Sequence, residues 1–105
     1  MSIRDRQEGF EKKFAMDEET KFKAMARRNK LLGLWAAEKL GKTGTDADAY
    51  AKEVVQADFE EAGDNDVFRK VRGDFDTAGV VLSDTQIRSI MDELLATAVE
   101  QIKNN

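Results

Sequence analysis

The residue types that carry most enzyme chemistry are scarce in this sequence. Histidine and cysteine are both absent from its 105 residues, which removes the usual general base, the commonest metal ligand and any thiol nucleophile. Carboxylates are numerous, but they are scattered over stretches that read as helix surfaces, and no serine-based signature is present. The sequence therefore predicts a protein that is not an enzyme and that needs no cofactor or metal ion.

One short segment could contact a phosphate. The sequence LGKTGT at residues 40–45 resembles the end of a phosphate-binding loop. Such a loop has a glycine five positions before Gly41, where this chain has Ala36, and it follows a strand. Here the segment follows an expected helix, so Gly41 is better explained as a helix C-terminal residue. Weak binding of ADP or ATP remains an open alternative, and it would use Lys42, Thr43 and Thr45.

A second segment begins like a calcium loop. In DNDVFRKVRGDF, residues 64–75, Asp64 and Asp66 stand at the first and third positions. The sixth position is Arg69 where the loop requires glycine, and the twelfth is Phe75 where it requires glutamate. We therefore expect Asp64 or its neighbour to cap a helix, with Asp66 in its first turn.

Charge is distributed unevenly along the chain. The net charge is −4, yet residues 21–42 hold seven lysines and arginines against one glutamate. Binding to a phosphate backbone requires such charges on the face of a domain that is basic as a whole, whereas the isoelectric point is about 4.9. We expect a solvated or salt-bridged helix face and no nucleic-acid partner. The nucleic-acid alternative would use the ARRNK cluster, through Arg27, Arg28 and Lys30.

The elements that would position these residues are all helices. Apolar residues recur at three- and four-residue steps, and proline is absent. Each expected helix is too short to be stable alone, so the pattern predicts an all-α fold, a small four-helix bundle over residues 20–105 behind a flexible N-terminal segment, 1–19. The expected helices span about 20–41, 46–62, 66–76 and 84–103.

Local signals refine these helices. Ser83 and Gln86 are spaced as a capping box at the start of the last helix, and Thr45 is expected to open the second. Gly33, inside the first helix, is expected to mark the close approach of another helix. The apolar stripe of the first helix comprises Phe22, Met25, Ala26, Leu32, Ala36 and Leu40.

The first nineteen residues are patterned differently. At about 100° per residue, Ile3, Phe10 and Phe14 fall on one helical face. Three apolar side chains cannot offset an ordering cost of about 1–2 kcal/mol per residue. The pattern predicts a segment that is disordered or frayed in the free protein and becomes helical against a partner. The alternative is a frayed helix extension with no role.

No targeting or membrane segment is evident. The N-terminus lacks the apolar stretch and cleavage site of a signal peptide. No apolar run approaches the roughly 18 residues that a membrane span requires. We therefore expect a soluble protein of a reducing cytoplasm.

Two long stretches resemble a known family. FEKKFAMDEETKFKAMARRNKLLGLWAAEKLGKTG and YAKEVVQADFEEAGDNDVFRKVRGDF are similar to the zeta subunit, the ATPase inhibitor of alphaproteobacterial F-type ATP synthases. The resemblance implies a four-helix domain behind a mobile inhibitory segment. That segment would fold into a helix between the alpha and beta subunits, beside the gamma rotor, and block ATP hydrolysis.

The resemblance assigns the inhibitory role to about residues 1–19. Within this segment, the contacts with F1 are predicted from the type of each side chain and its position on the helical face. The free chain is expected to be monomeric, and the bound chain peripheral to the inner membrane through F1. The alternative is a helical adaptor or a weak adenine-nucleotide-responsive module without strong ATPase inhibition. The expected apolar anchors are Ile3, Phe10, Phe14 and Met16, and the expected polar contacts are Arg4, Arg6, Lys12 and Lys13.

Overall fold

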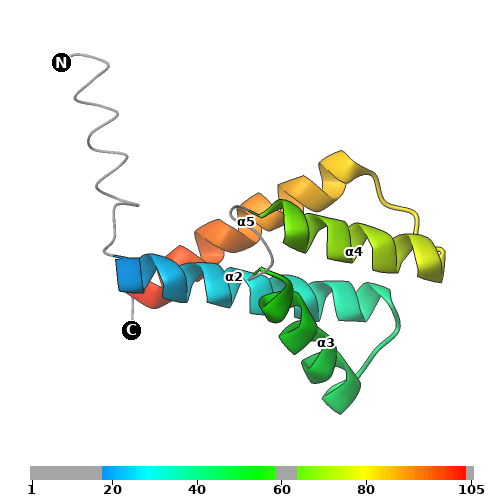
Figure 1. The fold of residues 1–105 in the computed structure, drawn as a ribbon, viewed down its shortest axis with the longest axis horizontal. Coiled ribbons are helices and arrows are strands. Elements are labelled where there is room, and N and C mark those ends of the chain that lie inside the picture. The colour runs from blue at the N-terminus through cyan, green and yellow to red at the C-terminus, as the bar shows by residue number, and fades with distance from the viewer. Residues whose placement is uncertain (1–17, 59–63, 104–105) are drawn as a thin grey trace.

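The computed structural model describes residues 18–58 and 64–103, and within these ranges the chain forms four α-helices (Figure 1). The predicted all-α fold and small four-helix bundle are confirmed. The helices are α2 (Glu18–Lys39), α3 (Gly44–Ala57), α4 (Asn65–Ala78) and α5 (Asp84–Lys103).

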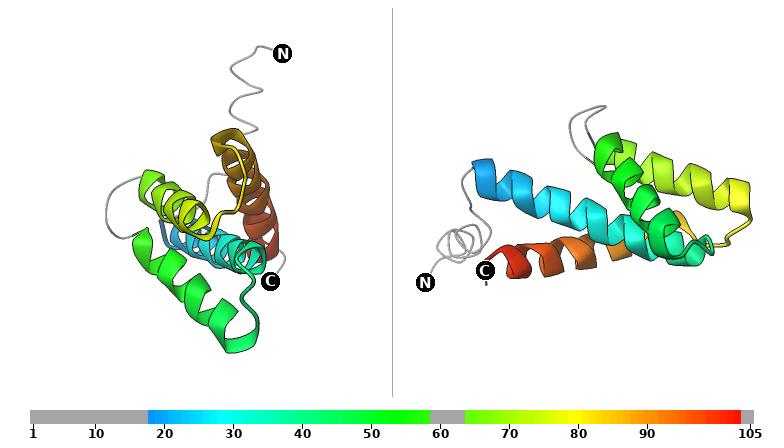
Figure 2. Two further views of the ribbon diagram at one scale, coloured as in Figure 1. Left: turned by 90° about the vertical axis from the view of Figure 1, so that its right-hand side faces the viewer. Right: turned by 90° about the horizontal axis from the view of Figure 1, so that it is seen from below.

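Helix α2 is the element on which the others are arranged. It packs most extensively against α3 and α5. Figures 1 and 2 show α5 running back along α2, so that the end of α5 lies beside the beginning of α2. Helices α3 and α4 lie mainly beside the second half of α2, and the last turn of α3 reaches its first half, where Val55 lines a hollow together with Ala26. One end of the molecule is therefore built from all four described helices and the other from two.

The hydrophobic core lies at the end where the four helices meet. The apolar second half of α2 has to be covered on several sides, and the structure provides this cover. Trp35 of α2 meets Phe75 of α4 in an edge-to-face contact with ring centroids 5.7 Å apart. The buried residues of the core are Leu32, Ala36, Ala37, Tyr50, Val54, Val67, Val71, Phe75, Ile87 and Met91.

Helices α2 and α3 approach each other closely at Gly33, as the sequence predicts. A Cβ atom at this position would lie 2.5 Å from the Cα atom of Ala51. Contacts this short do not occur between real Cβ atoms and backbone. Glycine at 33 and alanine at 51 therefore set the distance between the two helices.

The start of α5 confirms the predicted capping box. The backbone N–H of Gln86 donates to Ser83 Oγ at 3.1 Å, and the backbone N–H of Ser83 donates to Gln86 Oε1 at 2.8 Å. These reciprocal bonds satisfy two amides that the helix leaves free at its first turn. The predicted bounds 84–103 agree with those of α5.

Other predicted helix ends are shifted. The prediction that places residues 77 and 78 in a loop is wrong, because α4 continues to Ala78. It ends there because Gly79 takes a left-handed conformation (φ 75°) and Val80 N–H returns to Phe75 O at 2.9 Å. Helix α3 begins at Gly44 with Thr43 at its N-cap, so Thr45 does not open it. Residues 59–62 of the second predicted helix lie outside the described residues.

Candidate functional site

The residues predicted to contact F1 all lie in the N-terminal segment. That segment joins α2 at Glu18, where the described residues begin. The surface around the beginning of α2 is therefore the part of the site that the structure describes. The predicted contacts that lie outside the described residues are Ile3, Arg4, Arg6, Phe10, Lys12, Lys13, Phe14 and Met16.

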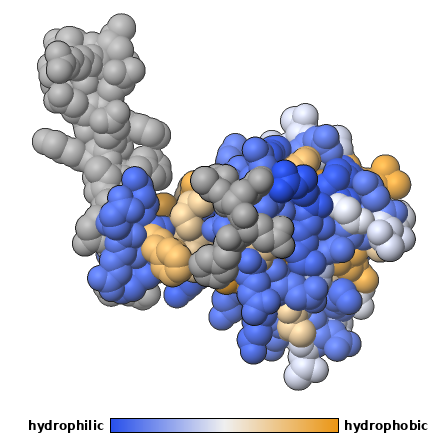
Figure 3. Space-filling model, viewed as in Figure 1, coloured by the Kyte–Doolittle hydropathy of each residue, from blue (hydrophilic) through white to orange (hydrophobic). Residues whose placement is uncertain are grey.

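Phe22 is the most exposed aromatic side chain of this surface. It is 59% exposed, so its predicted place on the buried stripe of the first helix is wrong. The reason is tertiary: the end of α5 and the last turn of α3 lie near the first turns of α2, and they leave Phe22 largely uncovered. Figure 3 shows apolar surface over this part of α2 within a mainly hydrophilic face.

Two shallow hollows flank Phe22. The first has a volume of about 600 Å³ and includes Met25 of α2 and Asp58, which follows α3. The second, of about 510 Å³, brings residues of three helices together, including Val55 of α3 and Ile102 of α5. The beginning of α2 thus offers recessed apolar surface with charged edges, which is typical of binding sites for other chains.

A buried arginine, Arg28, lies on α2 six residues after Phe22. Arg28 is only 1% exposed. Its Nε donates to Asn29 Oδ1 at 2.6 Å, and its Nη1 lies 3.8 Å from Asp64 Oδ2. Asp64 also accepts a 2.8 Å bond from Arg88 of α5. Asp64 stands at the N-cap of α4 as predicted, but its side chain joins two arginines and caps no amide.

The environment of Arg28 perturbs two titrating groups. Burial lowers the pKa of the Arg28 guanidinium, and the Asp64 and Asp58 carboxylates oppose this shift. Burial also raises the pKa of Asp58, which the Asn29 amide and the charge of Arg28 partly offset. Within the described part of the chain, three buried side-chain polar atoms have no hydrogen-bond partner: Arg28 Nη2, Asn29 Nδ2 and Asp58 Oδ1. This cluster ties the middle of α2 to the segments on either side of the α3–α4 connection.

The basic cluster is therefore divided between the interior and the surface. The salt-bridged reading holds for Arg28, while Lys30 is exposed. The burial of Arg28 was not predicted, although it stands four residues before Leu32 and three after Met25, on the apolar stripe itself. This spacing on the helix is the signal from which the burial of Arg28 could have been predicted.

The residues predicted for weak nucleotide contact lie at the α2–α3 connection. Lys42, Thr43 and Thr45 are exposed. The Lys42 ammonium lies 6.0 Å from the centre of the Tyr50 ring, and Thr43 caps α3 through its backbone without a side-chain hydrogen bond. Nucleotide contact at these residues stays a prediction.

Residues 18–58 and 64–103 contain neither a metal-binding cluster nor a membrane-spanning helix. No cluster of three or more acidic side chains is placed to hold a metal ion. None of the described helices combines the length and apolar character needed to cross a membrane.

A small helical bundle with recessed surfaces between its helices, and no metal cluster among the described residues, is suited to binding another protein chain. The sequence model of the family described as ATPase inhibitor subunit zeta matches residues 1–101, and the chain belongs to this family. Its general role is accordingly the inhibition of an ATPase, and its partner lies among the F1 components of ATP synthase.

Comparison with solved structures supports the same fold. A protein whose structure was solved by NMR in solution is 54% identical in sequence to this chain, and the two structures superpose with a TM-score of 0.70. The match covers 79% of this chain and 94% of that one. No curated protein is significantly similar to the chain.

Proposed function

We propose that the chain inhibits ATP hydrolysis by inserting its N-terminal segment, folded into a helix, between the alpha and beta subunits of F1 beside the gamma rotor. The inserted segment obstructs rotation in the hydrolytic direction and contributes no chemistry of its own. The chain acts as a monomer in the cytoplasm and is held at the inner membrane through F1.

The observation that carries this proposal is the extent of the family match. It runs over residues 1–101 and so includes the segment as well as the helices. In a helical conformation, the sequence of the segment would place Ile3, Phe10 and Phe14 on one face between charged residues. Three anchors suit binding coupled to folding, because the partner supplies the missing apolar surface.

The position of the segment's attachment gives further support. The segment joins α2 at the two-helix end of the molecule, away from the core around Leu32 and Phe75. The core is formed by side chains of the four described helices. The segment can therefore enter a partner while the four described helices keep their packing.

The test compares hydrolysis by purified F1 with the full chain and with a Phe10→Ser, Phe14→Ser double variant. We expect the double variant to lose inhibition by at least about tenfold in the concentration required, because two buried aromatic anchors are removed. Val81→Ser is the matched control, since Val81 is 95% exposed in the α4–α5 connection. The control should inhibit like the unaltered chain.

Equal inhibition by the double variant and the control would refute insertion of the segment. It would favour the alternative in which the bundle itself acts as an adaptor. Absence of inhibition by the unaltered chain would refute the inhibitory proposal as a whole.

A further inference from the structure

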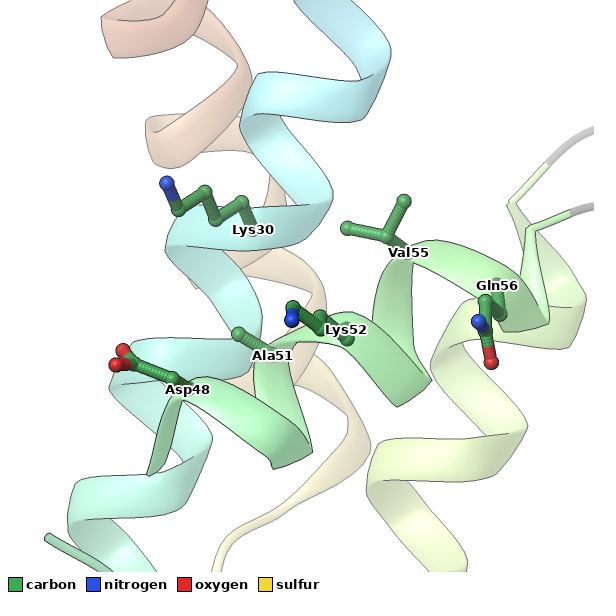
Figure 4. A pocket seen from close by; sticks show the side chains of 6 residues that line it. All are labelled: Lys30, Asp48, Ala51, Lys52, Val55 and Gln56. Atoms are coloured by element: carbon green, nitrogen blue, oxygen red, sulfur yellow. The ribbon is translucent and has the colours of Figure 1, made fainter. Parts of the chain in front are cut away.

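A groove runs along the first half of α2 between α3 and α5. The hollow that contains Phe22, Ala26 and Ile102 shares Lys30 and Val55 with a second hollow of about 510 Å³ on the α3 side. In Figure 4, Lys30 extends from α2 while the other labelled residues of this second hollow come from α3. The two hollows form one surface, which we call the α2 groove.

The groove has an apolar floor and a basic rim. Phe22 and Ala26 lie one turn apart on α2, with Val55 of α3 and Ile102 of α5 on either side. Phe22 and Lys30 are eight residues apart, so this face of α2 is about 12 Å long. The charged residues lining the groove are Lys23, Arg27, Lys30, Lys52 and Asp48.

Three of the four cations have no carboxylate partner in the described part of the chain. Arg27 donates to the neutral amide of Gln101 at 2.8 Å, and neither Lys30 nor Lys52 forms an ion pair there. Lys23 pairs with Glu19 at 3.2 Å, but both side chains are exposed and such a pair contributes little. The groove is lined by four cations and one carboxylate, Asp48. In a chain of net charge −4, this excess of basic charge around an apolar floor is complementary to a partner with apolar and acidic side chains.

We propose that the α2 groove binds an acidic amphipathic helix on the outer surface of F1 and so docks the bundle independently of the N-terminal segment. This inference rests on the proposed function. A helix of two to three turns matches the length of the groove, with its apolar stripe on Phe22, Ala26 and Ile102. Carboxylates on both flanks of that helix would meet Arg27, Lys30 and Lys52.

The same residues fit a nucleic acid less well. Arg28, the central residue of the basic cluster, is buried and committed to Asp64. The floor offers a single aromatic ring, Phe22, where single-stranded nucleic acid needs successive stacking platforms.

The test measures binding of the full chain to immobilised F1, together with inhibition of hydrolysis. Ala26→Glu places a charge on the floor of the groove, and Lys30→Glu reverses its basic edge. Each should weaken binding by about tenfold, and added salt should weaken binding of the unaltered chain. The matched controls carry the same changes elsewhere: Val81→Glu in the α4–α5 connection and Lys39→Glu at the end of α2 should bind like the unaltered chain.

The outcomes separate this inference from the proposed function. If both groove variants bind F1 as tightly as their controls, with unchanged helix content by circular dichroism, the groove is not the docking surface. Inhibition by the unaltered chain would still support the proposed function in that case. If only the Phe10→Ser, Phe14→Ser variant loses binding to F1, docking through the groove is likewise overturned. Groove-dependent binding to a single-stranded oligonucleotide or to anionic vesicles, without an effect on F1, would overturn it as well.

Discussion

Replacement of Gly33 by alanine sets two opposing effects against each other. Alanine is favoured over glycine in a helix interior by about 1 kcal/mol. The added methyl group, however, would lie 2.5 Å from Ala51 Cα and 3.0 Å from Ala51 Cβ. Overpacking costs about 1–3 kcal/mol, and the high end applies here because a backbone atom cannot move by changing rotamer. Since the helices must also separate along their length, we expect a net loss of about 2 kcal/mol.

This prediction is checked by thermal and urea unfolding followed by circular dichroism. A loss of about 2 kcal/mol should lower Tm by roughly 8–16 °C in a domain of this size. Gly73→Ala is the control: Gly73 lies inside α4, is exposed, and an added Cβ would meet nothing within 4 Å. It should stabilise the protein by about 0.5–1 kcal/mol. If Gly33→Ala is as stable as the unaltered protein, the close packing of α2 on α3 does not have the energetic role inferred here.

Two further substitutions test individual side chains. Burial raises the pKa of Asp58, so the Asp58 carboxyl group holds its proton more tightly in the native state than in the unfolded chain. The free energy of unfolding therefore decreases as the pH rises through the native-state pKa of Asp58. Asp58→Asn should therefore raise Tm at pH 7 and leave it unchanged at about pH 3, below the ordinary carboxylate pKa of about 4; a lower Tm at pH 7 would contradict this reasoning. Ser83→Ala removes one capping bond and should cost about 1 kcal/mol in urea unfolding. Thr97→Ala, which removes an exposed hydroxyl within α5, should change stability by less than about 0.5 kcal/mol, and equal effects of the two would argue against the cap.

Local sequence signals predicted the helices well where the cause of the structure is itself local. The capping box at Ser83 depends on residues within one turn, and the bounds of α5 follow from it. The close approach at Gly33 was predicted because glycine inside an apolar helix needs a compensating contact. The end of α4 was missed, since the glycine that stops the helix, Gly79, lies three residues beyond the predicted end.

Features that depend on the lengths and positions of other helices were not predictable in this way. Phe22 continues the apolar period of α2, but its side chain stays largely exposed because the neighbouring helices cover this part of α2 incompletely. Arg28 reads as surface charge until the segments around Asp64 are placed beside it. The α2 groove joins Lys30, Val55 and Ile102 from three helices, and no spacing in the chain relates them. The predicted contacts at residues 1–17 stay predictions.

The unbroken course of α2 has a mechanical consequence. The helix runs for 22 residues, about 33 Å at 1.5 Å per residue, from the junction with the N-terminal segment into the middle of the core. No glycine turn or loop interrupts it, because its one internal glycine is held against Ala51. If the N-terminal segment is held by a rotating partner as proposed, a torque applied at Glu18 would pass along a stiff rod to the side chains that surround Leu32, and the load would be shared by packed helices.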